Sequence, residues 1–336
     1  MTDARRAVVV IWRIESPRLI ASLTRLVRDV GLAEELAQDA FVTALEQWPV
    51  TGVPDKPGAW LLVTARHRAI DLIRREQNRD AKYAVLAHSL GEADAADRIV
   101  DEPIGDDLLS LVFLTCHPVL PRESRIALTL RLFGGLTTEE IARAYLVPSP
   151  TIGQRISRAK RTLAEAHVPF EVPQADEMPA RVGSVLEVLY VIFTEGHAAT
   201  SGATWVRRDL ADEAMRLGRV LAALLPREPE VHGLVALMEL QASRFDARGD
   251  GVLVQDQDRR FWDHTLIEHG LAELDRATTL GKPLGPYTVQ AAIAACHSRA
   301  RTFEDTDWEA ITALYDALTQ LTPSPVVAAC PSVKIT

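Results

Sequence analysis

GLTTEEIARAYLVPSPTIGQRISRAKRTL, residues 135–163, decides the fold of this chain because it contains the signals of two short helices joined by a turn. Thr137 followed by Glu140 is a capping box, in which the hydroxyl and the carboxylate each accept a bond from a backbone N–H at a helix start. Ser149 is the expected cap of the second helix, with Pro150 at its first helical position. This pattern predicts a helix–turn–helix.

The second of these helices is expected to have one apolar and one polar face. Its apolar residues, at positions 152, 156, 159 and 163, fall on one side at 100° per residue. Residues 141–164 contain five Arg or Lys and no acidic residue. A helix that enters the major groove of DNA needs an apolar back and a front of hydrogen-bonding and cationic groups. The alternative is a solvated basic helix in an ordinary bundle. The candidate DNA-contacting residues are Ser149, Thr151, Gln154, Arg155, Arg158, Lys160 and Arg161.

Charge is unevenly distributed along the 336 residues, a length that predicts two or three domains. Residues 170–336 contain 24 acidic and 15 basic side chains, whereas residues 1–169 contain 22 of each. The whole net charge of −9 therefore lies in the C-terminal half, and the low overall pI does not argue against binding of nucleic acid by the N-terminal half.

Cysteine usage and hydropathy predict a cytoplasmic protein with no membrane association. The three cysteines show no C-x-x-C spacing, which fits a reducing compartment and predicts neither a disulfide framework nor a zinc site. The apolar run 7–12 is too short for the core of a signal peptide, and no stretch reaches the length of a membrane span.

We expect no catalytic residues, no metal and no cofactor. The sequence has no glycine-rich phosphate loop and no nucleophile–base motif. His264 and His269 are five residues apart, which is off the spacing that places two imidazoles on one metal. Asp256, Asp258 and Asp263 near Arg259 and Arg260 are interpreted as a salt-bridged loop, with a metal or phosphate site as the alternative.

Periodicity predicts an all-α chain of several parts. We expect a helical block at 1–80, an acidic linker at 81–106, four short helices at 107–167, a proline-spaced linker at 168–180 and a helical extension at 181–336. In the first block Ser16 and Pro17 are expected to begin a helix that ends at Gly31, followed by helices at 32–48 and 59–78. The extension has amphipathic segments near 181–194, 209–225, 229–245, 262–280, 286–301 and 307–321, which suggest a helical-repeat array although no fixed period is present.

Three segments resemble, in order and spacing, the sigma factors of the extracytoplasmic-function type in the sigma-70 family of RNA polymerase subunits. DVGLAEELAQDAFVTALEQW (29–48) is similar to the region 2 helix that grips the polymerase clamp, and PGAWLLVTARHRAIDLIRR (57–75) to the helix that melts and reads the −10 promoter element. Residues 135–163 are similar to region 4, which reads the −35 element. The resemblance implies core polymerase, at its clamp and flap regions, and promoter DNA as partners.

The resemblance also assigns site residues. It implies polymerase contacts through an acidic patch of Glu34, Glu35, Gln38 and Asp39, which would otherwise be a solvated helix face. Single-stranded DNA requires cations along a backbone track and flat side chains on which bases stack. The candidates for the −10 element are Lys56, Trp60, Arg66, His67, Arg68, Arg74 and Arg75, with the hydrophobic core as the alternative place for Trp60.

The extension resembles the long tetratricopeptide-like C-terminal extension of one subgroup of these sigma factors. The matching segments include LEVLYVIFTEGHAA (186–199), EPEVHGLVALMELQASR (228–244) and TDWEAITALYDALTQLTPSPVV (306–327). Members of the subgroup continue past this point with further helices. We therefore expect a truncated or frameshifted end, or a terminus covered by a partner chain, and we expect the extension to regulate activity, including through a regulatory protein that binds it.

The expected function is that of a promoter-specificity subunit of RNA polymerase with no catalytic activity. The main alternative is a stand-alone helix–turn–helix regulator with a C-terminal sensor domain, and a third is an enzyme fused to a DNA-binding module. The first 80 residues separate these alternatives, because a regulator has no need of an acidic clamp-facing helix followed by a basic, aromatic-bearing one.

Overall fold

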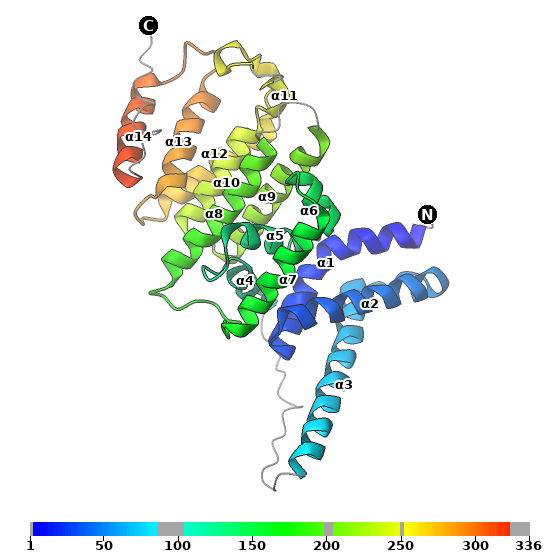
Figure 1. Cartoon of the computed structure of the whole chain (residues 1–336). Helices are drawn as coiled ribbons and strands as arrows, with labels where there is room; N and C mark the ends of the chain where they lie inside the picture. Colours follow the sequence, from blue (N-terminus) through cyan, green and yellow to red (C-terminus); the bar gives the residue numbers. More distant parts are fainter. Residues whose placement is uncertain (1–2, 86–103, 198–203, 249–251, 323–336) are drawn as a thin grey trace. The chain divides into compact units, whose positions relative to one another are not determined.

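The computed structural model describes residues 3–85, 104–197, 204–248 and 252–322, and every regular element in these ranges is helical (Figure 1). This confirms the all-α prediction. The chain divides into two compact units, an N-terminal unit, Met1–Arg181, and a C-terminal unit, Val182–Thr336.

The N-terminal unit begins with three helices, α1 (Asp3–Val27), α2 (Val30–Thr51) and α3 (Pro57–Val85), each of which packs against the other two. The carboxylate of Asp29 caps α2 by accepting a bond from the backbone N–H of Leu32. Small residues such as Ala37, Ala40 and Ala65 are fully buried where the helices meet, so that their backbones approach closely.

Helix α1 differs from the prediction that it begins at Ser16 and Pro17. It begins at Asp3, and Pro17 lies inside it. Upstream of the proline, Val8 is buried and the ring of Trp12 packs edge-on against Phe41 of α2 at 4.5 Å. This packing outweighs the local preference of proline to begin a helix. Helix α3 also extends past its predicted end at Asn78, to Val85, so the part of the predicted acidic linker from 86 to 103 lies outside the described residues.

Four short helices complete the N-terminal unit, as predicted: α4 (Ile104–Thr115), α5 (Arg122–Leu132), α6 (Thr138–Ala144) and α7 (Ser149–Glu165). The capping box of Thr137 and Glu140 is present at the start of α6. The predicted Ser149 cap is wrong by one residue. Pro148 is the N-cap of α7, and the Ser149 hydroxyl instead donates to Glu139 at 3.4 Å, because the turn is set by Leu146 in a left-handed conformation (φ 51°) and by the two flanking prolines.

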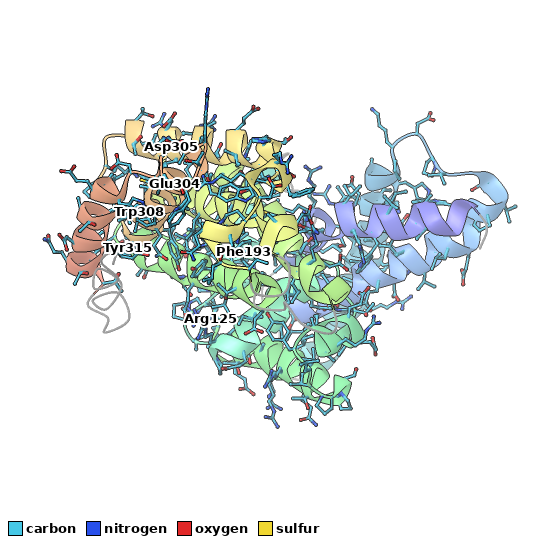
Figure 2. The ribbon with its side chains drawn as sticks, turned by 90° about the horizontal axis from the view of Figure 1, so that it is seen from above. Arg125, Phe193, Glu304, Asp305, Trp308 and Tyr315 are labelled. Atoms are coloured by element: carbon cyan, nitrogen blue, oxygen red, sulfur yellow. The ribbon has the colours of Figure 1, made fainter. Side chains whose placement is uncertain are left out.

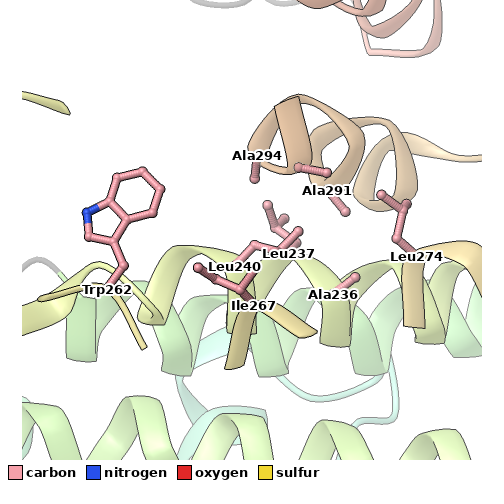
Figure 3. Close-up of a cluster of buried hydrophobic side chains, with 9 residues drawn as sticks. Ala236, Leu237, Leu240, Trp262, Ile267, Leu274, Ala291 and Ala294 are labelled. Carbon is pink, nitrogen blue, oxygen red and sulfur yellow. The ribbon is translucent and has the colours of Figure 1, made fainter. Parts of the chain in front are cut away.

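The C-terminal unit contains α8 (Met178–His197), α9 (Thr204–Leu224), α10 (Pro229–Ala242), α11 (Phe245–Arg248), η1 (Val254–Asp256), η2 (Arg259–Phe261), α12 (His264–Thr279), α13 (Pro286–Arg299) and α14 (Trp308–Leu321). Helix α10 is buried on all sides and packs against α9, α12 and α13, so it is the core helix of the unit. Figure 3 shows the cluster in which Leu237 and Leu240 of α10 meet Ile267 of α12 and Ala291 and Ala294 of α13.

Helix α14 closes the described part of this unit. Ile311 and Leu318 are buried against Val289 and Ile293 of α13, with Trp308 and Tyr315 packed against this cluster. Figure 2 labels Trp308 and Tyr315 on α14. The apolar face of α14 is thus covered in part by α13. The predicted altered terminus, 328–336, lies outside the described residues, and the tetratricopeptide-like repeat stays a prediction.

Candidate nucleic-acid interface

Helix α7 has the two faces that its sequence predicts. Ile152, Ile156, Ala159 and Leu163 are buried, whereas Gln154, Arg158 and Arg161 on the other side are exposed. No acidic residue occurs in the helix before Glu165, which lies 3.6 Å from Arg161 with both side chains exposed. The exposed face of α7 therefore presents hydrogen-bonding and cationic groups, which suits base edges and phosphates.

The structure does not place every α7 candidate on this face. Thr151 and Arg155 are half-buried, and Ser149 is turned towards Glu139 of α6. Lys160 is turned away, and its Nζ lies 2.5 Å from a carboxylate oxygen of Glu34 on α2.

Helix α3 has a line of exposed groups along one side. Trp60, His67 and Arg74 recur every seven residues, which returns to nearly the same direction on a helix and spaces them by about 10 Å. His67, Arg74 and Arg75 are exposed, while Leu61 and Ala65 on the opposite side are buried. The line offers cations that can bind the backbone of single-stranded DNA and a ring on which an unpaired base can stack.

Trp60 has a role in packing as well as in this line. It is half-buried, and its ring packs edge-on against the buried Trp48 at 5.4 Å. Lys56 precedes α3 and is exposed, and Arg66 is half-buried on the side of the helix. The indole edge of Trp60 is thus held in place by α2.

Arg68 contacts α2 rather than solvent alone. Its guanidinium donates to the Thr43 hydroxyl at 2.7 Å and lies 3.6 Å from the Asp39 carboxylate. Arg68, which is expected to contact DNA, is therefore paired with Asp39, which is expected to contact polymerase. The two side chains are 40% and 65% exposed.

The acidic patch on α2 divides into exposed and buried members. Glu35 and Asp39 are exposed and Gln38 is half-buried, but Glu34 is only 3% exposed. The Glu34 Oε1 accepts bonds from Gln38 at 2.8 Å and from Nε of Arg131 on α5 at 2.7 Å. Glu34 is therefore not at the surface of the chain in this structure.

Glu34, Arg131 and Lys160 form an ion cluster, here called the Glu34 cluster. Burial alone would raise the pKa of the Glu34 carboxyl, but the charges of Lys160 and Arg131 and their hydrogen bonds hold it below its ordinary value of 4.5. The carboxylate is therefore ionised and neutralised entirely within the chain at neutral pH.

Arg131 is a residue of this arrangement that sequence reasoning missed. Its one signal is a cation within the otherwise apolar run IALTLRL (126–132), and that signal does not identify a partner in α2.

Sites for a metal are not formed by the described residues. No group of three or more His, Cys, Asp or Glu side chains there is arranged to hold an ion. Asp258 binds Arg260 at 2.6 Å, and Asp263 caps α12, as expected of a salt-bridged loop. His269 is hydrogen-bonded to the buried Glu239 at 2.5 Å and His232 to Glu273 at 2.5 Å.

Among the residues that the structure describes, no helix is long and apolar enough to cross a bilayer.

Comparison with known families shows matches in each part of the chain. The family model for sigma-70 region 2 matches residues 11–79, which span α2 and most of α1 and α3, and the model for sigma-70 region 4 matches residues 110–163, which end in α7. Residues 181–278 match a family of unknown function, DUF6596.

Individual relatives agree with these matches. An uncharacterized protein of Rhizobium meliloti is 45% identical over 318 residues, which are 93% of this chain and 75% of the relative. The ECF RNA polymerase sigma factor SigK of Mycobacterium ulcerans is 31% identical over 153 residues, 44% of this chain and 78% of the relative. The probable ECF RNA polymerase sigma factor SigI of Mycobacterium tuberculosis is 30% identical over 170 residues, 49% of this chain and 57% of the relative. No solved structure matches the chain.

Proposed function

The chain belongs to the ECF type of the sigma-70 family of RNA polymerase sigma factors, and from this membership we propose which of its surfaces meets which partner. A sigma factor directs promoter-specific initiation of transcription and binds core RNA polymerase and promoter DNA. The alternative of a stand-alone regulator is set aside because the region 2 match covers residues 11–79, which such a regulator does not need.

The exposed face of α7 reads the −35 element. The observation that carries this proposal is the division of α7 into a buried apolar stripe and an exposed face with Gln154, Arg158 and Arg161. An arginine that bonds two acceptors on a guanine distinguishes bases by about 1–3 kcal/mol, whereas one that meets phosphate adds affinity for any sequence.

Binding of holoenzyme to promoter duplexes tests this proposal. Arg158→Ala and Arg161→Ala should each weaken the complex. A base-reading arginine should lose preference at one base pair, and a phosphate-binding one should flatten the salt dependence. Arg18→Ala is the matched control, because Arg18 is an exposed cation on α1, away from α7. If both α7 variants bind as Arg18→Ala does, α7 does not read the promoter.

The exposed line on α3 opens and holds the −10 element. His67 supplies a ring, and Arg74 and Arg75 supply cations. Lys56 and Trp60 lie at the start of the line.

Helix α2 binds the polymerase clamp. Its Glu35 and Asp39 are exposed and carry the negative charge that a basic clamp surface would attract. Glu34 can contact polymerase beside them only when its ion pairs with Arg131 and Lys160 are broken.

The C-terminal unit regulates this activity, in part through a protein that binds it. Two observations support the proposal: the unit has its own hydrophobic core, and residues 170–336 contain the whole net negative charge. We take Phe261 and Leu253 of this unit, which are 64% and 63% exposed, as the contact residues to test for such a protein.

A chain that ends at Arg181 tests the regulatory role. Arg181 is retained because its guanidinium donates to the Phe113 carbonyl at 2.8 Å and so belongs to the N-terminal unit. Promoter output should change when residues 182–336 are removed, and Phe261→Ser in the full chain should change it without altering stability. If both proteins match the full wild-type chain in output, core binding and solubility, the regulatory role is wrong.

The protein acts where polymerase and promoters are, in the cytoplasm. The sigma-factor family is not enzymatic, and we extend this to the present chain as a proposal.

A further inference from the structure

The segment before α12 places a buried tryptophan against two arginine side chains. Trp262 is 4% exposed, and the guanidinium carbons of Arg259 and Arg244 lie 4.6 Å and 5.8 Å from the centre of its ring. Cations over an aromatic face are attracted to it. The ring thus holds two positive charges together where α10, α12 and α13 meet, and Figure 3 shows its indole nitrogen turned away from the apolar cluster.

Arg259 is only partly satisfied by its own chain. Its Nη1 donates to the carbonyls of His297 and Ala300 at the C-terminal end of α13, at 2.5 Å and 2.6 Å. Its Nη2 is buried without a hydrogen-bond partner, and within the ranges that the structure describes no carboxylate forms an ion pair with it. Burial lowers the pKa of this guanidinium, an effect that Asp305 and Glu304 oppose without contacting it. A buried edge of a cation is costly unless a negative group completes its hydrogen bonds.

Unpaired buried polar atoms of the C-terminal unit gather in the same region. In the described part of this unit, five buried side-chain atoms lack a hydrogen-bond partner. All of them belong to residues 257–262, the end of α13 or the loop before α14: Gln257 Oε1, Arg259 Nη2, Trp262 Nε1, His297 Nδ1 and Thr306 Oγ1. Buried polar groups are normally paired, so this concentration requires an explanation. The nitrogens of Arg259 and Trp262 can only donate, so their partner must be an acceptor.

His297 shows that the region is electropositive. Its ring is half-buried beside Trp308, and burial together with the charges of Arg244 and Arg259 lowers its pKa from 6.5 to about 4. The imidazole is therefore neutral at pH 7, and its unpaired Nδ1 donates a hydrogen bond in one of its two tautomers. A water molecule would satisfy these donors and leave the positive charge uncompensated, whereas an anion would do both.

We propose that Arg259, Trp262 and His297 form a binding site for a small oxyanion, the carboxylate or phosphate group of a ligand. Arg259 Nη2 and Trp262 Nε1 supply the hydrogen bonds, and Arg244 adds positive charge. An oxyanion accepts several hydrogen bonds at once, and bonds to an ionised acceptor are about twice as strong as neutral ones.

A cavity borders this site and has room for the rest of a ligand. Its volume is about 500 Å³, and it is lined by Ala300, whose carbonyl binds the arginine of the site, and by Arg299 and Arg301. Asp305 and Asp307 also line it, but their carboxylates already accept bonds from backbone N–H groups of the loop and of α14. An anionic group in this cavity therefore meets two further cations next to the site.

The site is argued from geometry alone, whereas its purpose rests on the regulatory role proposed above for the C-terminal unit. Under that role, the bound anion sets promoter output. Binding can be measured without polymerase or promoter. Binding of the anion with unchanged promoter output would therefore support the site and contradict only the regulatory role.

Indole N–H resonances of the full-length chain, labelled with ¹⁵N-tryptophan, test the site. The chain has six tryptophans, and the spectrum of Trp262→Phe identifies the resonance of Trp262 by its loss. Sodium phosphate and, separately, sodium acetate are titrated at pH 7 and at an ionic strength held constant with NaCl. The Trp262 resonance should move downfield and saturate, and the anion that saturates at the lower concentration identifies the preferred group. No movement with either anion, or equal movement with NaCl alone, overturns the proposal.

Calorimetric titration with the same anions measures the affinity of variants. Trp262→Phe keeps a ring against the arginines and removes one donor to a charged acceptor, which should weaken binding about tenfold. Arg259→Gln should weaken it at least as much, while Arg260→Gln is the matched control, because Arg260 is exposed and paired with Asp258. Arg259 also holds the end of α13, so Arg244→Gln takes its place if Arg259→Gln does not fold. Wild-type affinity in both Trp262→Phe and Arg244→Gln overturns the proposal.

Discussion

Nε of Arg131 lies 2.7 Å from Oε1 of Glu34, although the two residues are 97 positions apart in the chain. This contact joins the helix that we assign to the polymerase clamp with the helices that lead to α7. The surfaces proposed for polymerase and for DNA are therefore coupled in the free protein, since one carboxylate cannot serve both its internal partners and polymerase.

The Glu34 cluster is expected to lose its contribution to stability in acid. Because Lys160 and Arg131 lower the pKa of Glu34, its ionised form stabilises the folded N-terminal unit fully above its ordinary value of 4.5, and this contribution is lost as the pH falls through the lowered pKa. The unfolding temperature of the wild type should therefore fall with pH in this range more steeply than that of Glu34→Gln, which cannot titrate at this position. Identical pH profiles for the two proteins would exclude Glu34 as the determinant.

Charge reversal on the exposed part of α2 is expected to weaken polymerase binding. Glu35→Lys with Asp39→Lys places positive charge where we infer a basic clamp surface, and like charges across an interface cost several kcal/mol. Affinity for core polymerase should be measured by pull-down and titration. Glu46→Lys is the control, since Glu46 is exposed further along the same helix. Equal loss in both proteins would indicate a general charge effect and no local site.

Removal of the cations at 74 and 75 is expected to impair strand opening more than initial binding. Arg74→Ala with Arg75→Ala takes two exposed charges from the line on α3, which we assign to single-stranded DNA. Permanganate reactivity of −10 thymines should fall in the variant holoenzyme, while closed-complex affinity changes less. Equal reactivity in variant and wild type would remove these residues from the opening step.

The C-terminal unit is expected to lose stability between pH 6.5 and 4. Burial, together with the nearby Arg244 and Arg259, lowers the pKa of His297 from 6.5 to about 4. The unfolded chain therefore binds this proton first, and stability present above pH 6.5 falls as the pH drops towards 4. For a half-buried ring we expect about 1–2 kcal/mol.

Thermal unfolding of His297→Phe isolates this effect. Phenylalanine keeps a ring beside Trp308, whose centroid lies 5.5 Å from that of His297, and does not titrate. The comparison is necessary because His117 of the N-terminal unit also has a pKa lowered to about 4 by burial and Arg181. Identical pH profiles for the two proteins would show that His297 does not contribute.

Local sequence signals predicted the helix–turn–helix and its faces. The capping box at Thr137 and Glu140 and the stripe from Ile152 to Leu163 depend on residues within one or two turns of each other. Ser149 shows the limit of such rules, because the turn before α7 places Pro148 at the cap. The helices of the C-terminal extension were predicted from the same kind of local pattern, and they lie close to their predicted ranges.

Contacts between residues far apart in the chain determine the features that the local sequence did not predict. Pro17 favoured a helix start, but packing of Val8 and Trp12 on their neighbours extends α1 to Asp3. Glu34 belongs to an acidic patch by spacing, and only the fold shows that α5 and α7 bring Arg131 and Lys160 to it. No periodicity encodes a pair separated by 97 residues.

Run-off transcription tests the central claim most directly. Core polymerase, the purified chain and the DNA upstream of its own gene should together give a transcript with a defined start, and neither protein alone should give it. Arg158→Ala with Arg161→Ala should abolish most of that transcript while Arg18→Ala leaves it intact. A transcript of equal yield without this chain, or with the α7 variant, would contradict the account.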